Sequence, residues 1–217
     1  MKLRHELSDL PFAGALTPHE GNLSAEGHYD GSHFTGGITY SGARADGARF
    51  MECAFSDVTF EDSTARRSRF SDVWLRDVRL LSVDLAETTW LDAMFTGCAA
   101  AGIQAFDATL RRVIFHECKL DSVNFRGAQL ADVTFEGCLL RDVDFAGATL
   151  RRARFPRSTL ARADFSRATL EKADLRGAEL DMTAGFESLR GAIMTTAQFL
   201  SLAPTLARQL GIDLKDA

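Results

Sequence analysis

A large apolar residue recurs at every fifth position from Phe50 to Leu180. Of these 27 positions, 24 hold Phe, Leu or Trp, and the exceptions are Ala65, Ala100 and Ala105. No insertion or deletion breaks the phase. A period of five fits neither a helix nor a strand, since both would scatter these side chains over several faces. The repeat therefore requires an architecture in which five residues form one structural unit.

A second column lies two residues before each large residue, and it holds only small or β-branched side chains. If each pentapeptide forms one side of a square coil, both columns point inward and twenty residues complete a turn. Coils stacked about 4.8 Å apart then satisfy each other's backbone hydrogen bonds. The narrow interior explains why neither column contains Lys or Glu. We therefore predict an all-β solenoid of almost seven turns over this segment.

The two ends depart from this pattern. Tyr29 and Phe34 are five residues apart but out of phase with Tyr40, which predicts one extra residue between them. A stacked solenoid leaves an unpaired edge, so we expect residues 1–22 to form a loop or cap over the rod end. We divide the chain into an N-terminal cap with irregular first coils (1–44), a β-helix (45–182) and a C-terminal helical segment (183–217).

The C-terminal tail has large apolar residues at helical spacing. Thr195 or Thr196 is a candidate N-cap, Gly211 marks the end, and Pro204 is expected to break the segment into two short helices. One interpretation is a plain cap on the rod. The other is a two-fold dimer contact. The residues that would form this contact are Phe199, Leu200, Leu202, Leu206 and Leu210.

The stretch ADFSRATLEKADLRGAEL, residues 163–180, closely follows A(D/N)LXX, the consensus of the pentapeptide-repeat proteins. About residues 45 to 182 resemble this family, and the resemblance implies a right-handed quadrilateral β-helix. The tail pattern SLRGA…LAPTLARQLGI resembles that of the members that protect DNA gyrase: the mycobacterial fluoroquinolone-resistance protein, the Qnr family and the albicidin-resistance protein. That resemblance implies a homodimer through the tail. It also implies a rod that mimics DNA, binds DNA gyrase or topoisomerase IV, and relieves quinolones or other topoisomerase-targeting antibiotics.

Acidic residues dominate the outward position two after each large residue. They are Glu52, Asp57, Asp62, Asp72, Asp77, Glu87, Asp92, Asp107, Glu117, Asp132 and Asp142. Before the column turns basic from Arg152 to Lys172, its only basic residues are Arg67 and Arg112. Residues 1–149 carry 14 basic and 22 acidic side chains, whereas residues 150–180 carry 8 basic and 4 acidic ones. The acidic rows fit DNA mimicry or a solvated repeat surface; the basic coils depart from what the resemblance implies.

The basic coils have a plain structural interpretation. Their arginines can pair with carboxylates of neighbouring coils, such as Asp164, Glu171 and Asp174. Each such surface pair contributes about 0 to 1 kcal/mol.

Two columns repeat at twenty residues, the length of one coil. Trp74, Met94 and Ile114 form an outward apolar column, which either contacts a partner or lies under the N-terminal segment. Cys98, Cys118 and Cys138 form an interior stack, and Cys53 shares their column. Buried cysteines of this kind serve as small packing residues, so we expect no metal or redox chemistry.

Catalysis is not indicated. The sequence lacks a P-loop, GxGxxG, HExxH and GxSxG, and its five histidines lack metal-ligand spacing. A filled solenoid also has no substrate cleft. No apolar run reaches transmembrane length and the start does not read as a secretory signal, so we expect a cytoplasmic protein without cofactors. The net charge of −5 argues against direct nucleic-acid binding. The sequence thus favours a topoisomerase-binding DNA mimic; the alternative is an interaction scaffold with another partner.

Overall fold

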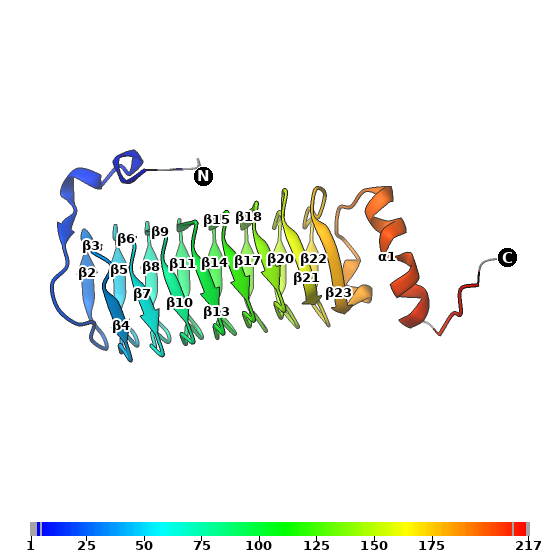
Figure 1. Ribbon diagram of the computed structural model, residues 1–217, viewed down its shortest axis with the longest axis horizontal. Coiled ribbons are helices and arrows are strands. Elements are labelled where there is room, and N and C mark those ends of the chain that lie inside the picture. The colour runs from blue at the N-terminus through cyan, green and yellow to red at the C-terminus, as the bar shows by residue number, and fades with distance from the viewer. Residues whose placement is uncertain (1–3, 5, 210, 216–217) are drawn as a thin grey trace.

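The computed structural model describes residues 4, 6–209 and 211–215. The chain winds into a straight rod of stacked four-sided coils, closed at its C-terminal end by one helix (Figure 1). Three sides of the coil are parallel sheets in which, from β4 and β5 to β20, each strand pairs with the strand twenty residues further along the chain. The fourth side is held by single parallel bridges, such as Asp84 to Gln104. The predicted four-sided β-helix is confirmed.

We number the faces in chain order. Face 1 contains β2 (His28–Asp30), β5 (Arg49–Met51), β8 (Arg69–Ser71), β11 (Thr89–Leu91), β14 (Thr109–Arg111), β17 (Gln129–Ala131), β20 (Thr149–Arg151) and β22 (Thr169–Glu171). Face 2 contains β1 (Thr17–Pro18), β3 (Ser32–Phe34), β6 (Ala54–Ser56), β9 (Trp74–Arg76), β12 (Met94–Thr96), β15 (Ile114–His116) and β18 (Thr134–Glu136). Face 3 contains β4 (Thr39–Ser41), β7 (Thr59–Glu61), β10 (Arg79–Leu81), β13 (Ala99–Ala101), β16 (Lys119–Asp121), β19 (Leu139–Arg141), β21 (Thr159–Asp164) and β23 (Glu179–Ala184). Face 4 carries the isolated bridges from Arg44 to Asp164.

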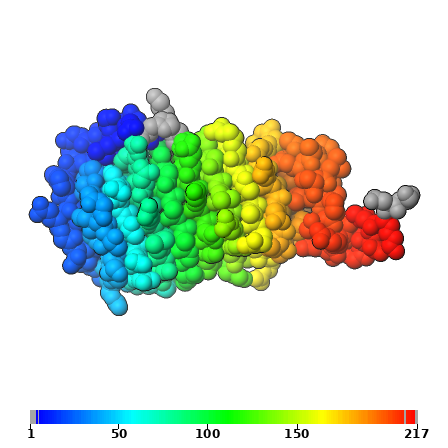
Figure 2. Space-filling view, viewed as in Figure 1, coloured from blue at the N-terminus to red at the C-terminus, as the bar shows by residue number. Residues whose placement is uncertain are grey.

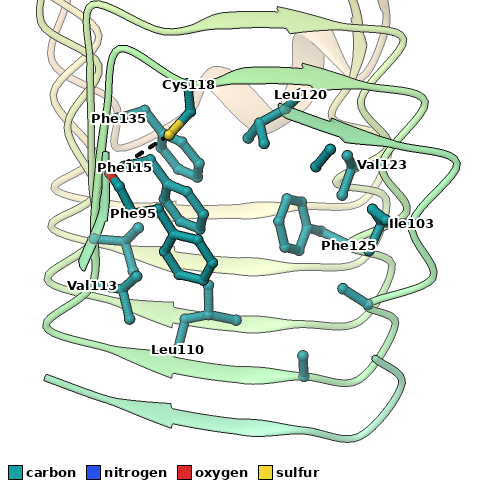
Figure 3. Close-up of a cluster of buried hydrophobic side chains, with 14 of the residues drawn as sticks. Phe95, Ile103, Leu110, Val113, Phe115, Cys118, Leu120, Val123, Phe125 and Phe135 are labelled. Atoms are coloured by element: carbon teal, nitrogen blue, oxygen red, sulfur yellow. Dashed lines mark hydrogen bonds between the residues drawn. The ribbon is translucent and has the colours of Figure 1, made fainter. Parts of the chain in front are cut away.

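The large residues stack along the axis of the rod. Rings one coil apart lie nearly parallel: the centroids of Phe95 and Phe115 are 4.6 Å apart, and those of Phe115 and Phe135 are 4.8 Å apart (Figure 3). Phe50 and Phe70 stack in the same way on face 1. This axial core supplies the hydrophobic stabilisation that individual coils, with three-residue strands, do not have by themselves.

The small inward column also joins neighbouring coils. The Cys118 thiol donates to the carbonyls of Phe95, one coil back, and of His116 (Figure 3). Ser158 in the same column donates to the Phe135 carbonyl at 2.9 Å. Thiols and hydroxyls fit this column because each is small and can donate its hydrogen to a nearby backbone carbonyl. A larger polar group would not fit in the space.

Two narrow apolar voids of about 50 and about 40 Å³ lie on the axis. The first is lined by Ala65 and the second by Ala100 and Ala105, the three positions where alanine replaces a large central residue. Both are far smaller than a substrate cavity. They are gaps in packing that the sequence exceptions create.

Ala105→Val should stabilise the rod by about 1 kcal/mol, because two added methyl groups enter the second void. Urea unfolding of the variant and of the natural protein measures the change. Ala163→Val is the control, since Ala163 is fully buried in the tightly filled small column. It should lose about 1–3 kcal/mol through overpacking. Equal destabilisation by both changes would contradict the expectation.

The N-terminal register contains the predicted extra residue. Tyr29 pairs with Phe50 and Phe34 with Phe55, both 21 residues apart, whereas Tyr40 pairs with Phe60, 20 residues apart. The extra residue therefore lies between Phe34 and Tyr40.

Residues 1–22 were predicted to cover the rod end, and the later part of this segment does so, with the His19 ring 4.4 Å from the Phe34 ring of the first coil. Residues 4 and 6–16, here called the N-terminal arm, do not. The arm folds back along the side of the rod, over face 2 (Figures 1 and 2). It contains two 3₁₀ turns, η1 (Leu7–Asp9) and η2 (Ala13–Ala15). Leu23 packs against the first coil instead.

The coil continues beyond Leu180, where the repeat pattern stops. The Ile193 amide donates to the Ala173 carbonyl at 2.8 Å, and η3 (Phe186–Leu189) buries Phe186 in the last coil. The ladder there slips, since Ala163 pairs with Met182 rather than with residue 183. This slip hides the final coil from a strict five-residue count.

One helix, α1 (Thr196–Gln209), follows, so the predicted break at Pro204 is wrong. Thr195 caps its start, with its Oγ1 accepting from the Gln198 amide. Leu202 and Ala207 are buried on either side of Pro204, and the Gln198 side chain donates to the Leu175 carbonyl. Docking on both sides of the proline holds the helix continuous despite the missing backbone hydrogen bond.

Candidate partner-binding surface

The acidic column lies on the edges of the rod. Every one of its eleven residues has a left-handed backbone, with φ from 47° at Asp62 to 61° at Glu87. Glycines such as Gly97 and Gly127 occupy the same edge position in other coils. Asp tolerates this conformation better than most residues do, which gives part of the acidic bias a structural cause. The edges still display the carboxylates at fixed positions along a rigid rod.

Five carboxylates of the column are paired with arginine. Asp92 accepts two hydrogen bonds from Arg112, one coil further on, and Asp132 and Asp142 accept two each from Arg152 and Arg162. The hydrogen bonds from arginine lower the pKa of Asp92, Asp132 and Asp142. The other two pairs are Asp77 with Arg76 and Glu87 with Arg66.

Two arginines of the basic coils, Arg152 and Arg162, therefore pair with the acidic column itself, and Arg157 pairs with Glu136. Of the three predicted partners in the basic coils, only Asp174 forms an ion pair within the described residues, with Arg176 at 2.7 Å. The expectation that named Asp164 and Glu171 was wrong. The column positions stack twenty residues apart, so Arg152 and Arg162 meet Asp132 and Asp142 of the preceding coil directly.

The unpaired carboxylates concentrate toward the N-terminal half. Within the described residues, Glu52, Asp57, Asp62, Asp72 and Asp107 have no ion pair with a Lys, Arg or His side chain. Asp57 and Glu117 lie on the edge between faces 2 and 3, and Asp62 lies on the edge between faces 3 and 4. A groove on the first of these edges is lined by Asp57, Asp77 and Glu117, and Gly97 leaves it open. Arg79 and Lys119 also line this groove. Within the described residues, Asp57, Asp62 and Glu117 thus border face 3 without a lysine or arginine partner, and Glu52 and Asp72 lie in the same way on the edge between faces 1 and 2.

Asp72 differs from the rest of the column. Burial, and then the nearby charge of Asp92, raise its pKa, although Arg4 and Arg112 oppose the shift. An acid whose pKa is raised on folding destabilises the fold at pH values above that raised pKa. The penalty disappears as the pH falls below the unfolded value, where both states are protonated.

Asp72→Asn should therefore leave the stability at pH 7 unchanged or raise it by a few tenths of a kcal/mol, on the order of a surface charge effect. Asn tolerates the left-handed edge as well as Asp does. Thermal unfolding at pH 7 and at pH 3 measures this, and the difference between variant and natural protein should shrink at pH 3. Asp107→Asn, the same substitution at another left-handed edge position, serves as the comparison.

The outward apolar column is not a free contact surface. Trp74 and Met94 are each 2% exposed beneath Leu10 and Phe12 of the N-terminal arm, and Ile114 is partly buried at the border. The predicted partner contact through these residues is therefore wrong. The alternative prediction, that the N-terminal segment covers them, is confirmed. The arm itself was not identified from the sequence, although Leu7, Leu10 and Phe12 are the signal that could have identified it.

The C-terminal residues assigned to a dimer contact divide into two sets. Leu202 is 5% exposed and Leu206 is partly buried against the last coil, so both serve the cap within the chain. Phe199 and Leu200 are 53% and 63% exposed. Leu210 lies outside the described residues. Only the outer side of α1 is available to a second chain.

All four cysteines are buried, and the pKa values of two of them, Cys53 and Cys118, are raised. Burial raises the pKa of Cys53 to about 11. Hydrogen bonds with Cys138 and Cys98, and then burial, raise the pKa of Cys118. Within the described residues no group of three His, Cys, Asp or Glu side chains is placed to hold a metal ion. In the same part of the chain, no helix has the length and apolar character to cross a membrane.

Comparisons with known proteins agree with this architecture. The family model for a pentapeptide repeat region matches residues 88–165 and 108–184. The family model for pentapeptide repeats in nine copies matches residues 45–89. Comparison with curated protein sequences finds no match.

Solved structures also share the fold. A trypsin-treated variant of QnrB1, a plasmid-mediated fluoroquinolone resistance protein, is 18% identical with a TM-score of 0.50, over 92% of this chain and 96% of that chain. HetL, a pentapeptide repeat protein involved in heterocyst differentiation regulation from the cyanobacterium Nostoc sp. strain PCC 7120, is 22% identical with a TM-score of 0.44, over 80% of this chain and 92% of that chain. From the repeat matches, which run from residue 45 to 184, and the coils they describe, the chain belongs to the pentapeptide-repeat proteins.

Proposed function

We propose that this protein binds a type II topoisomerase, DNA gyrase or topoisomerase IV, through the acidic edges of face 3, where it takes the place of DNA. By occupying the DNA-binding surface it protects the enzyme from antibiotics that act on the enzyme–DNA complex. The observation that carries the proposal is the set of carboxylates without a lysine or arginine partner within the described residues, Asp57, Asp62 and Glu117, on the two edges that border face 3 of a rigid rod.

The geometry of the edges supports recognition by a cationic groove. Asp57 and Asp62 lie in successive units of one coil, on either side of β7, and Glu117 lies further along the first edge. Successive coils are about 4.8 Å apart, so each edge offers regularly spaced sites for acidic groups. Lysines and arginines that bind phosphates of DNA would meet carboxylates instead, with a similar dependence on salt.

The ion pairs refine which carboxylates are available. Asp92, Asp132 and Asp142 are already neutralised by arginine, so they contribute less to the field outside the rod. The shared fold with QnrB1, a fluoroquinolone resistance protein, agrees with the proposed class of function.

We also propose that two copies associate through the outer side of α1. Phe199 and Leu200 are the exposed large apolar residues of the helix, and Ile193 beside it is 40% exposed. A two-fold contact would cover them and double the length of the acidic rod.

A supercoiling assay with purified gyrase, with and without a quinolone, tests the proposed function. We expect inhibition of supercoiling at micromolar protein, or relief of quinolone-induced cleavage at lower concentrations. The same titration at raised salt should weaken the effect. Neither inhibition nor protection would contradict the proposal and favour a scaffold for another partner.

Phe199→Asp with Leu200→Asp should convert the dimer to monomers, because two charges would enter the apolar contact. The molar mass from light scattering during size exclusion measures this. Stability should hardly change, since both side chains are exposed in one chain. The matched control is Thr196→Asp with Ser201→Asp, which adds the same charge to exposed positions of α1. A natural protein that is monomeric at 100 μM or so would contradict the dimer.

A further inference from the structure

Face 1 becomes basic in the C-terminal half of the rod. There its strands β14, β17, β20 and β22 lie side by side in register (Figure 1). From residue 109 onward, the outward positions of this face and of its two edges carry seven bases and three acids, a local charge of +4. The acids are Asp132, Glu171 and Glu187, and the bases are Arg111, Arg112, Arg151, Arg152, Arg167, Lys172 and Arg190.

Most of these bases are free to bind an anion. Arg112 and Arg152 form ion pairs with Asp92 and Asp132. The other five are exposed and have no ion pair within the described residues: Arg111, Arg151, Arg167, Lys172 and Arg190. The two remaining acids of the face, Glu171 and Glu187, cannot neutralise all five. The face therefore keeps an excess of positive charge.

Small neutral side chains lie between the bases. The outward column beside Arg111 and Arg151 consists of Thr109, Gln129, Thr149 and Thr169. The edge between faces 4 and 1 has no side chain at Gly127 and Gly147, and a Cβ at Gly147 would meet nothing nearer than 3.9 Å. Threonine and glutamine donate hydrogen bonds to phosphate oxygens, as arginine and lysine do. The face is thus low in relief and combines cations with neutral donors.

The bases are distributed along the rod axis. Arg151 lies two coils beyond Arg111, and Arg190 lies in the second coil beyond Arg151, next to the groove that it shares with Arg167. Four coils span about 19 Å at about 4.8 Å for each coil. Duplex DNA carries one phosphate charge for about every 1.7 Å of its axis. A duplex laid along the face therefore brings phosphates within reach of several bases at once.

We infer that the C-terminal half of face 1 binds the phosphate backbone of duplex DNA, on the side of the rod opposite face 3. Charge complementarity favours a polyanion, and the regular column of neutral donors matches a regularly repeated backbone. The net charge of −5, which argues against direct nucleic-acid binding, averages this face with the acidic coils. The inference concerns another face and another ligand than the proposed function, and it stands or falls independently of it.

Fluorescence anisotropy of a fluorescein-labelled duplex, titrated with the full natural protein and without any topoisomerase, tests the inference. We expect a Kd of about 10–100 μM at low salt, in the range of non-specific binding. The logarithm of the binding constant should fall against the logarithm of the salt concentration with a slope of about −4, because four or five phosphates are contacted. Two duplexes of unrelated sequence should bind equally. Absence of binding at low salt would overturn the inference.

Arg111→Ala with Arg151→Ala should weaken binding at least fivefold and flatten the salt slope by about 1.8, or about 0.9 for each lost phosphate contact. The matched control is Arg79→Ala with Lys119→Ala. These two bases are also exposed and without an ion pair within the described residues, but they lie on face 3. The control should change the Kd by less than twofold. Equal losses in the two double variants would show that only the overall charge matters, and would overturn the inference.

Glu171→Lys tests the same face by a gain of binding. It replaces an acid beside Arg151 with a base, so the duplex should bind at least threefold more tightly. Circular dichroism confirms that each variant keeps its coils. An unchanged affinity of this variant would contradict the inference. So would a polyglutamate chain that binds the natural protein more tightly than a duplex of equal charge, since the face would then belong to an acidic protein.

Discussion

Changing Asp57, Asp62 and Glu117 together to lysine should raise the protein concentration that half-inhibits gyrase supercoiling at least 100-fold. These side chains lack arginine or lysine partners within the described residues and border face 3. A hundredfold loss corresponds to about 2.7 kcal/mol, or roughly 1 kcal/mol for each reversed contact. Fewer ion contacts also release fewer counterions, so the dependence of inhibition on salt should flatten. The assay is the supercoiling titration at two salt concentrations.

The fold should tolerate these changes. Lys172 and Arg157 already occupy equivalent left-handed edge positions. The matched control is Glu171→Lys, Glu179→Lys and Asp181→Lys, which alters net charge by the same amount at the C-terminal coils. It should weaken inhibition by less than about tenfold, since it acts only through the overall field. Equal losses in the two triple variants would show that net charge, and not the edges of face 3, determines binding.

The five-residue repeat was sufficient to predict the coil because both inward columns are dictated by the interior. Phe135, Phe145 and Phe155 are fully buried as that repeat requires, and the small column admits only Ala, Cys, Ser, Thr, Val or Ile. The extra residue near Gly36 was also predictable, because a change of phase is visible in the sequence itself.

The exterior could not be predicted in the same way. A repeat fixes which side chains point outward, but it does not say what covers them, and so Trp74 was open to two interpretations. The sequence showed which residues form the acidic column. It did not show their left-handed backbone or their arginine partners, because these depend on which coils are neighbours in the rod. Pro204 was assigned a break from local preference, whereas docking of Leu202 and Ala207 decides the helix.

Gly185→Ala should destabilise the C-terminal cap by more than about 3 kcal/mol. Gly185 has φ of 86°, and a Cβ there would lie 2.1 Å from the carbonyl carbon of Phe165 and 2.4 Å from the amide nitrogen of Ser166. Both neighbours are backbone atoms of the preceding coil and cannot turn aside as a side chain would. The last coil must therefore lift, which breaks the ladder from Ala184 to Ile193 and the seat of α1.

Gly177→Ala provides the matched comparison. Its φ of 79° is also left-handed, but the nearest atom to its Cβ, the Arg157 amide nitrogen, is 3.7 Å away. This change should cost only about 1 kcal/mol, the conformational part of the effect. Urea unfolding gives the two losses, and amide exchange in α1 shows whether the cap opens first. If the proposed dimer forms through α1, Gly185→Ala should also yield monomers while the acidic coils stay folded. Equal stability of the two variants would mean that the last coil can shift without loss of stability. In that case α1 would not stabilise the C-terminal end of the rod.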